Sequence, residues 1–365
     1  MKLGSESVIE HTGHTWSEII QQPKVWPTTL SRVERAMGHD NLRSKLEGAR
    51  VLLTGAGTSA YAAAAVAANW PRAFDVPSTD LLVDTRRLLS DANVVISLGR
   101  SGDSPESLAT VEQIHRLRPD ILQLAITCNP DGALARSSLL QSIILDPLTD
   151  DKSLVMTSSF SNLVLAGYTL ADKSRVETVL PAACANASAS FSEINETTKR
   201  LAGLVKERIV LLCSSPLVPW AQEGALKSLE MAAGKYPVLA ETYLGLRHGP
   251  MSFLGPDAVV VCLLSNAPIR RRYELDLVEE LKTKRLGYLV AIGATTGEAP
   301  LFDDHFPAIV TAGSDDLRTP FEILGPQLLG YHLSLRNGLD PDNPSLDGVI
   351  NRVVSGVTIY QDSQV

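Results

Sequence analysis

The amino-acid sequence predicts an α/β protein in which two similar domains each hold a doubly wound parallel sheet between helices. Short runs rich in Val, Ile and Leu alternate with longer helical patterns, which is typical of buried parallel strands and their crossover helices. The spacing of these runs recurs once along the chain. The length of 365 residues also exceeds the roughly 150 of one average domain. Together these observations indicate two domains rather than one small module.

Residues 1–48 are expected to form a helical segment that precedes the first domain. Residues 17–20 and 31–37 have apolar side chains at helical spacing. Pro23 and Pro27 are expected to break the helical pattern between them, because proline removes a backbone donor.

Six apolar runs are the strand candidates, three in each predicted domain. In the first domain, over 49–190, they begin near positions 50, 93 and 122. In the second domain, over 195–340, they begin near positions 208, 258 and 288. Successive starts lie about 43 and 29 residues apart in the first series and about 50 and 30 apart in the second. The same strand and helix pattern is therefore expected to be used twice.

The boundary between the domains is expected within residues 180–195. A helical pattern over 187–206 lies between the two series of strands. The last segment, 341–365, begins with a cluster of Asp and Pro residues and ends in the β-like run 357–360. We expect this C-terminal tail to lie over the functional site.

The charge of the chain argues against polyanions as its main partners. Its 33 Lys and Arg residues against 41 Asp and Glu residues give a formal net charge of −8. The average field therefore repels nucleic acid and anionic membranes. A small phosphorylated ligand is compatible with this charge, because it needs only a local pocket of amide donors.

Cysteine usage and the apolar runs indicate a soluble, cytoplasmic protein without a metal site. The four cysteines are scattered without a Cys-x-x-Cys pair, so reduced, buried thiols are expected rather than disulfides or zinc ligands. Residues 1–21 are polar and do not look like an export signal. The longest apolar runs, such as 258–264, are far shorter than the roughly 20 residues that span a bilayer.

The first candidate binding loop follows the first predicted strand. Residues 54–59 read TGAGTS and enter an alanine-rich helix. In this arrangement the glycines allow a tight turn, and the helix amides with the hydroxyls of Thr58 and Ser59 face an anion. A dinucleotide site is less favoured, because the Gly-x-Gly-x-x-Gly pattern is incomplete and no acidic residue closes the next strand. A purely structural turn with a serine cap is the remaining alternative.

A second loop of the same kind follows the next predicted strand. Residues 97–107 read SLGRSGDSPES, and Pro105 suits the first position of a helix. Because neighbouring parallel strands end at the same edge of a sheet, both loops are expected to meet there and to bind a phosphate monoester. Arg100 is a candidate for a further charged contact, and a solvated loop arginine is its alternative.

Acid and base candidates lie in the second half of the chain. Residues 223–230 read EGALKSLE, which places Glu223, Lys227 and Glu230 on one face of a helix. A surface stripe of ion pairs is the alternative. Residues 245–250 read GLRHGP and hold His248 beside a rigid turn. A carboxylate and an imidazole beside a phosphate pocket are the groups that open a sugar ring and move a proton between neighbouring carbons.

These motifs resemble the sugar isomerase (SIS) domain family. The loops at 54–59 and 100–104, the helix at 223–230 and the turn at 247–250 are similar to successive motifs in the isomerase part of glucosamine-6-phosphate synthase. The resemblance covers about residues 45–365. Further matches are similar to the galactosamine-6-phosphate deaminase subgroup, also labelled tagatose-6-phosphate ketose/aldose isomerase; they are 99–107, 126–129, 156–160 and 351–354. The resemblance implies two SIS domains with five-stranded parallel sheets, in a homodimer or a larger assembly.

The resemblance also implies roles for individual residues. By matching position, Ser59, Ser101 and Ser104 would bind the sugar phosphate, and the two loops add Gly57, Thr58 and Arg100 as candidate contacts. Glu230 would move the proton between C1 and C2, Lys227 would match an active-site lysine, and His248 would open the ring. In this family the histidine can come from the neighbouring subunit. Residues near the sugar would include Thr157, Ser158 and Arg352, the last in place of a tail lysine. One departure is Gly99, where the synthase has a serine, which makes Arg100 a candidate replacement.

The function expected from these residues is that of an enzyme acting on a hexosamine 6-phosphate. Ring opening, proton transfer through an enolamine and loss of ammonia would leave the ketose 6-phosphate, without a metal or redox cofactor. Plain aldose–ketose isomerisation is the alternative, because it shares the enolised intermediate. A sugar-phosphate sensor is the alternative outside enzymes, and residues 1–48 do not suit its DNA-binding helices. A glutamine-dependent synthase is disfavoured, because the chain begins Met1-Lys2-Leu3 rather than with a catalytic cysteine. These residues do not distinguish a galacto from a gluco substrate.

Overall fold

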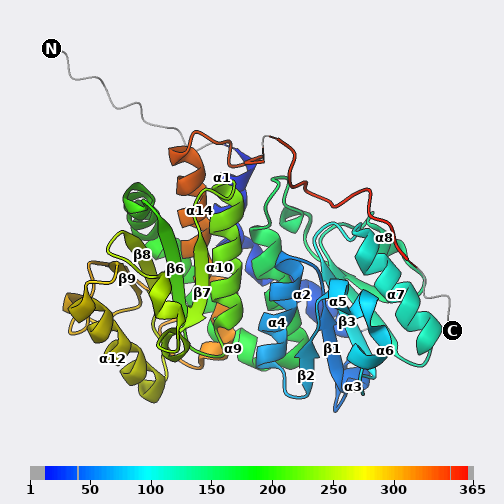
Figure 1. Ribbon diagram of the computed structural model, residues 1–365. Coiled ribbons are helices and arrows are strands. Elements are labelled where there is room, and N and C mark those ends of the chain that lie inside the picture. The colour runs from blue at the N-terminus through cyan, green and yellow to red at the C-terminus, as the bar shows by residue number, and fades with distance from the viewer. Residues whose placement is uncertain (1–12, 39–40, 346, 361–365) are drawn as a thin grey trace.

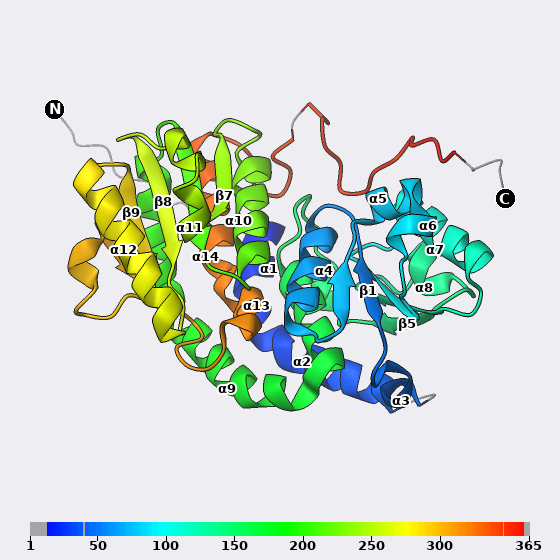
Figure 2. The same ribbon diagram turned by 60° about the horizontal axis from the view of Figure 1, so that its bottom comes forward.

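Two parallel five-stranded sheets form the framework of the protein, one in each domain (Figures 1 and 2). The computed structural model describes residues 13–38, 41–345 and 347–360. The parts of the expected N-terminal and C-terminal segments that fall on 1–12 and 361–365 lie outside the described residues. The α/β fold class with two tandem domains is confirmed.

The first sheet has the strand order β2-β1-β3-β4-β5. Its strands are β1 (Val51–Thr54), β2 (Ala73–Asp75), β3 (Val94–Gly99), β4 (Leu122–Thr127) and β5 (Gln141–Ile144). The helices of this domain are α4 (Thr58–Asn69), α5 (Ser78–Val83), α6 (Thr85–Leu88), α7 (Pro105–Leu117) and α8 (Ala133–Arg136), followed by the 3₁₀ turn η1 (Pro147–Thr149). The reversal of strand order between β1 and β3 is the switch point of a doubly wound sheet.

The second sheet repeats this topology in the order β10-β9-β8-β6-β7. Its strands are β6 (Arg208–Cys213), β7 (Val238–Thr242), β8 (Ala258–Leu263), β9 (Tyr288–Ile292) and β10 (Asp304–Phe306). Its helices are α10 (Val218–Met231), α11 (Tyr243–Leu246), α12 (Pro268–Lys284), α13 (Thr319–Glu322) and α14 (Leu324–Arg336). The 3₁₀ turns are η2 (Pro250–Phe253), η3 (Ala299–Leu301) and η4 (Asp315–Leu317).

All six strands expected from apolar runs are confirmed as β1, β3, β4, β6, β8 and β9. The four strands without such a run, β2, β5, β7 and β10, flank them at the edges, and most of their residues are only partly buried. A partly buried edge strand does not need a continuous apolar sequence. The β-like run 357–360 is irregular and mostly exposed, and it adds to neither sheet.

The N-terminal segment forms three helices, α1 (His14–Ile20), α2 (Gln22–Met37) and α3 (Leu42–Leu46). Pro23 lies in the first turn of α2, as expected for a helix start, but the break expected at Pro27 is wrong. Pro27 lies inside a continuous helix, and side chains just before and just after this residue hold the helix to the rest of the protein. Trp26 donates to the Ser161 hydroxyl at 3.0 Å, and the Thr29 hydroxyl donates to Asn162 at 2.6 Å. Tertiary contacts therefore outweigh the hydrogen bond that proline removes.

The long helix α9 (Ser158–Leu204) connects the two domains along one side of the molecule (Figure 2). The helix predicted between the domains is confirmed, but it is longer than expected and contains the whole expected boundary region, 180–195. Its break lies instead at Asp172, with φ −159° and ψ 92°. The Asp172 carboxylate accepts hydrogen bonds from the Ser174 hydroxyl at 2.6 Å and the Arg175 amide at 3.3 Å, which caps the second half of the helix.

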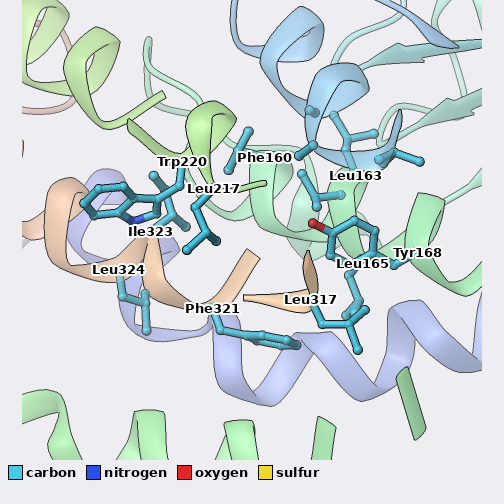
Figure 3. Packing of buried hydrophobic residues seen from close by; sticks show 14 of the residues in the cluster. Phe160, Leu163, Leu165, Tyr168, Leu217, Trp220, Leu317, Phe321, Ile323 and Leu324 are labelled. Atoms are coloured by element: carbon cyan, nitrogen blue, oxygen red, sulfur yellow. The ribbon is translucent and has the colours of Figure 1, made fainter. Parts of the chain in front are cut away.

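One hydrophobic core extends from the first domain into the second, as Figure 3 shows. In it, side chains of α9 face those of α10 and of the segment that leads into α14. The labelled residues of this cluster are Phe160, Leu163, Leu165, Tyr168, Leu217, Trp220, Leu317, Phe321, Ile323 and Leu324. The Trp220 indole also donates to the Glu322 carbonyl at 3.0 Å. Because close-packed side chains resist rearrangement, this core sets the position of one sheet relative to the other.

The close contact of α9 with α4 can be tested at Gly167. A Cβ atom there would lie 2.3 Å from Cγ2 and 2.7 Å from Cγ1 of Val66, a fully buried, β-branched side chain. We expect Gly167→Ala to lower the free energy of unfolding by about 1–3 kcal/mol in denaturant titrations. Gly203→Ala, in the same helix with open space around its Cβ, is the matched control and should be stabilising by about 0.5–1 kcal/mol. Equal effects of the two substitutions would contradict the packing described here.

Candidate active site

The loop after β1 turns sharply into α4 because of two glycines. A Cβ at Gly55 would lie 2.7 Å from the backbone carbonyl carbon of Ser59, so only glycine allows the strand to approach the helix this closely. Gly57 has φ +55°, a conformation that L side chains rarely adopt. The turn brings Thr58 and Ser59 into the first turn of α4, where backbone amides have no helical acceptor.

The loop after β3 reaches α7 in a similar way. Gly102 has φ +70°, and Ser104 occupies the capping position before Pro105. The Ser101 hydroxyl accepts a hydrogen bond from the Asp103 amide at 3.2 Å. The Ser104 hydroxyl donates to the Glu106 carboxylate at 2.9 Å.

The two loops line one cavity of about 190 Å³, here called the loop cavity. Its polar side chains include Ser59, Ser101, Ser104, Ser107 and Arg100, and its backbone groups include Gly57 and Gly102. The expectation that both loops meet at the carboxyl edge of the first sheet is confirmed. Hydroxyls together with the N-terminal turns of two helices, each longer than ten residues, provide the donors that a small anion requires.

The same edge of the second sheet is occupied by carboxylates of the chain itself. Glu274 on α12 is fully buried and accepts from the Ser214 hydroxyl at 2.6 Å and the Ser265 amide at 2.7 Å. Asp315 accepts from the Ser265 hydroxyl and, at 2.8 Å, from the Asn266 amide. The hydroxyls of Ser214 and Ser265 and the amides of Ser265 and Asn266 are therefore already bonded within the chain.

The helix α10 places three ionisable side chains beside the first domain. The Lys227 ammonium is fully buried and lies 2.6 Å from the Glu230 carboxylate and 3.4 Å from that of Glu223. It also donates to the Thr58 hydroxyl at 3.1 Å, which links α10 to α4 of the other domain. Glu223 is fully buried as well, whereas the Glu230 side chain is 23% exposed. The alternative of a surface stripe of ion pairs is therefore wrong.

Burial and charge shift the protonation of this cluster. Burial raises the pKa of the Glu223 carboxyl to about 8, against the opposing charge of Lys227. Burial alone would lower the pKa of Lys227, but the charges of Glu223 and Glu230 raise it above its ordinary value. Lys227 therefore stays charged at neutral pH and faces Glu230. Tyr61, one turn after Thr58, lies near the cluster, and burial followed by the charges of Glu223 and Glu230 raises the pKa of its phenol.

A second cavity of about 400 Å³, here called the tail cavity, lies over this cluster. Thr58 and Glu230 form one part of its wall and Leu154 and Met156 another. The C-terminal tail forms the remaining part, with Val349, Ile350, Asn351, Arg352, Val354 and Ser355. In Figure 1 this tail, in red, runs from α14 across the top of the first domain. Because Arg100, Met156, Arg352 and Val354 line both cavities, the anion donors of the loops and the Glu230 carboxylate border adjoining spaces.

The two arginines assigned to the ligand have backbone partners in the structure. Arg100 donates to the carbonyls of Ser153 and Leu154, each at 3.1 Å, and to that of Arg352 at 2.7 Å. Arg352 donates to the Asp150 carboxylate at 2.6 Å and to the Asp151 carbonyl at 2.9 Å. Both arginines line the cavities, but these bonds fasten the tail to residues 150–154.

Thr157 and Ser158 lie behind the cavity walls rather than in them. Both are fully buried at the start of α9. The Thr157 amide donates to Asp151 at 2.8 Å, and the Ser158 hydroxyl accepts from Asn162 at 3.3 Å. The side chain from this loop that does reach the cavities is Met156. Which residues of the motif 156–160 line the cavities is therefore set by where the helix begins.

His248 lies apart from both cavities. It follows α11 and is exposed, and its amide donates to the Gly245 carbonyl at 2.9 Å. Gly245 is required there, because a Cβ would lie 2.5 Å from the Thr242 hydroxyl that caps α11. Arg247 anchors the turn through ion pairs to Asp276 and Glu280. Within one chain, the structure does not bring His248 to Glu230.

Sequence reasoning missed several residues of the site. Glu223 was visible on the same helical face as Lys227, but its burial was not. Ser107 and Met156 lie inside the motifs 97–107 and 156–160 but were not singled out, and Tyr61 lies outside every motif; the packing of loops and helices brings all three to the cavities or the Lys227 cluster. Among the described residues, no three His, Cys, Asp or Glu side chains are grouped in a way that could hold a metal ion. In the same part of the chain, no helix has the length and apolar character to cross a membrane.

Comparison with known proteins matches the chain to several phosphosugar enzymes. A family model described as "SIS domain" matches residues 47–172. A D-galactosamine-6-phosphate deaminase of Shewanella sp. is 34% identical over 98% of this chain and 95% of its own. One from Escherichia coli O157:H7 is 32% identical over 95% of this chain and 96% of its own. The crystal structure of tagatose-6-phosphate ketose/aldose isomerase from Escherichia coli superposes with a TM-score of 0.82, at 28% identity, covering 96% of this chain and 97% of that one.

Fold, site and relatives together define an enzyme of the class that isomerises or deaminates sugar phosphates. The chain belongs to the SIS domain family, in the group of the AgaS deaminases and tagatose-6-phosphate isomerases. The resemblance noted in the sequence is thus confirmed. The alternative of a non-catalytic sensor is not favoured, because these relatives are named as enzymes and match nearly the whole length of this chain.

The raised pKa of Glu223 predicts how stability changes with pH. Its folded carboxyl keeps its proton up to about pH 8, whereas an unfolded one ionises near 4.5. The folded state therefore binds the extra proton between these values, and the free energy of unfolding falls as pH rises through them. In Glu223→Gln this loss is absent. We expect the variant to gain stability relative to the wild type from pH 5 to pH 8, by on the order of a few kcal/mol.

Thermal unfolding of both proteins between pH 4 and pH 9 measures this difference. Glu279→Gln, at an exposed position of α12, is the control for the loss of one carboxylate at the surface. A difference between Glu223→Gln and wild type that stays constant with pH would show that Glu223 is ionised in the folded protein.

Proposed function

We propose that this protein converts a hexosamine 6-phosphate, with galactosamine 6-phosphate favoured, to the ketose 6-phosphate with release of ammonia. One observation carries the proposal: the carboxylate of Glu230, paired with the buried Lys227, borders a cavity that adjoins the serine-lined loop cavity. A ligand with an anionic group in the loop cavity would extend its other end toward that carboxylate. The relatives named as galactosamine-6-phosphate deaminases favour the galacto substrate.

The loop cavity would bind the phosphate. Its donors would be the hydroxyls of Ser59, Ser101 and Ser104 and the backbone amide of Gly57, all of which line the cavity. Ser104 would exchange its bond to Glu106 for one to the phosphate. The sugar would then occupy the tail cavity, between Met156 and the tail on one side and Thr58 and Glu230 on the other.

The proposed chemistry uses His248 to open the ring and Glu230 to move a proton from C2 to C1. His248 would open the ring and leave an aldehyde at C1 beside the amine at C2. Glu230 would take the proton from C2 and return it to C1, through an enolamine, which yields an imine at C2. Water then adds to the imine carbon, and the nitrogen leaves as ammonia while the C2 carbonyl of the ketose forms. Lys227 would place its positive charge 2.6 Å from the Glu230 carboxylate that takes the proton.

A second copy of the chain would supply His248. In its own subunit this residue is exposed and lines neither cavity. Leu229, next to Glu230, and Leu244, near His248, are 42% and 43% exposed, which is consistent with an apolar contact between subunits. A homodimer with shared sites would bring the ring-opening group of one copy to the Glu230 of the other.

Aldose–ketose isomerisation without loss of ammonia is the second candidate. It shares the enolised intermediate, and the structural relative from Escherichia coli is named a ketose/aldose isomerase. The two reactions differ in whether nitrogen is attached to C2. A substrate test therefore separates them.

The proposed reaction is tested by ammonia release. We expect galactosamine 6-phosphate to give ammonia and ketose 6-phosphate in equal amounts, and glucosamine 6-phosphate to react more slowly. Glu230→Gln keeps the shape of the side chain but not the proton acceptor, so kcat should fall roughly 10²- to 10⁴-fold with little change in KM. Ketose formation from an aldose phosphate, with no ammonia from either amino sugar, would favour the isomerase. Normal exchange of the C2 proton with D₂O in Glu230→Gln would remove Glu230 from this role.

The shared site is tested by mixing two inactive variants. His248→Ala and Glu230→Gln each damage every site of a homodimer. If the two residues act from different chains, each mixed dimer has one site with both residues intact, and an equal mixture should recover up to about a quarter of wild-type activity. Mixed dimers that form, as shown with differently tagged chains, but remain inactive would place His248 in its own subunit or outside catalysis.

A further inference from the structure

Arg100 holds a buried charge whose direct hydrogen-bond partners, in the part of the chain that the structure describes, are all backbone carbonyls. The residue is 5% exposed, and its three hydrogen-bond acceptors are backbone carbonyls. Among the described residues, no Asp or Glu oxygen lies within ion-pair distance of its guanidinium. Burial lowers the pKa of Arg100, and the charges of Asp151 and Asp150, which lie beyond ion-pair distance, oppose that shift only in part. A buried cation of this kind is costly unless an anion reaches it.

The guanidinium also has capacity for a further partner. It carries five N–H donors, and three hydrogen bonds are made within the described part of the chain. Arg100 lines both the loop cavity and the tail cavity. The remaining donors therefore lie at the junction where an anion in the loop cavity would meet the tail.

The same guanidinium is one of several groups that hold the tail to the rest of the protein. Nη2 of Arg100 donates to the carbonyl of Arg352. The Arg352 side chain in turn donates to Asp150 and to the Asp151 carbonyl. At the beginning of the tail, the Leu154 amide donates to the Asp342 carbonyl at 2.9 Å. The tail thus crosses the site between two contacts to residues 150–154, and Arg100 connects that segment with the loop after β3.

We propose that Arg100 is a positioning residue that couples a phosphate in the loop cavity to closure of the C-terminal tail over the site. An anion facing the two remaining N–H groups would hold the guanidinium in the orientation that binds the Arg352 carbonyl. With the tail held down, water is excluded from the Glu230 carboxylate and the sugar. The inference rests on the proposed function, because it takes the phosphate to bind in the loop cavity.

Trypsin provides a direct readout of tail closure. Arg352 is the sole Lys or Arg between positions 341 and 365, so cleavage within the tail releases one peptide, 353–365. We expect inorganic phosphate to slow this release in the wild type at least tenfold, compared with sodium chloride of equal ionic strength. The affinity for phosphate is measured on each protein by calorimetry.

Three variants distinguish coupling from simple phosphate binding. In Arg100→Met the peptide should be released faster, and saturating phosphate should no longer protect it. Arg100→Lys keeps a positive charge but lacks the planar guanidinium with its several donors, so phosphate should protect the tail only partly from trypsin. In Ser104→Ala the phosphate concentration for half-protection should rise while full protection is still reached. Arg50→Met, an arginine paired with Asp91 at the opposite edge of the same sheet, is the matched control and should protect as the wild type does.

Two results would overturn the inference in different ways. If the wild type binds phosphate, but phosphate protects wild type and Arg100→Lys equally, Arg100 does not couple the cavities and the proposed function stands. If the wild type binds no phosphate, the loop cavity is not a phosphate site, and the proposed function and the inference both fail. Thermal unfolding measurements establish whether each variant is folded. If Arg100→Met does not fold, the comparison of Arg100→Lys with the wild type tests the inference.

Discussion

The burial of the Lys227 ammonium between the two domains is the constraint on which the site depends. A buried ammonium is tolerated only with charged and polar partners, and α10 supplies Glu223 one turn before it and Glu230 one turn after. The remaining partner, the Thr58 hydroxyl, belongs to the first turn of α4 in the other domain. The loop after β1 and the helix α10 are therefore joined at a single cation. The continuous core between the domains keeps that geometry in place.

Two sheets of the same topology have taken opposite roles at their carboxyl edges. In both, strands end in turns with serine hydroxyls and free amides, which is the arrangement that attracts anions. In the second domain those donors bind Glu274 and Asp315, carboxylates supplied by the chain. In the first domain the corresponding donors line a cavity. The fold thus provides two equivalent positions, and the side chains decide which of them is open to a ligand.

The segment 150–154 joins the two ends of the chain to the site. Glu18 on α1 accepts from the Lys152 amide at 2.5 Å, and Asp342 of the tail accepts from the Thr15 amide at 2.7 Å. Burial and the charge of Glu18 raise the pKa of Asp151 to about 6. The N-terminal helices are therefore more than a lead-in to the first domain. They support the segment that carries the tail.

The sequence by itself determined the elements that depend on neighbouring residues. Apolar runs marked the six central strands, glycines and serines marked the two loops, and helical spacing placed Glu223, Lys227 and Glu230 on one face. The edge strands were not predicted, because partly buried strands have no such apolar run. Only the tertiary structure decided that this face is buried against Thr58, that Arg100 and Arg352 bind carbonyls, and that His248 lines neither cavity of its own chain. The reason is physical: a local pattern sets backbone conformation and amphipathicity, whereas the partner of a polar side chain depends on which distant segment packing brings within hydrogen-bond distance.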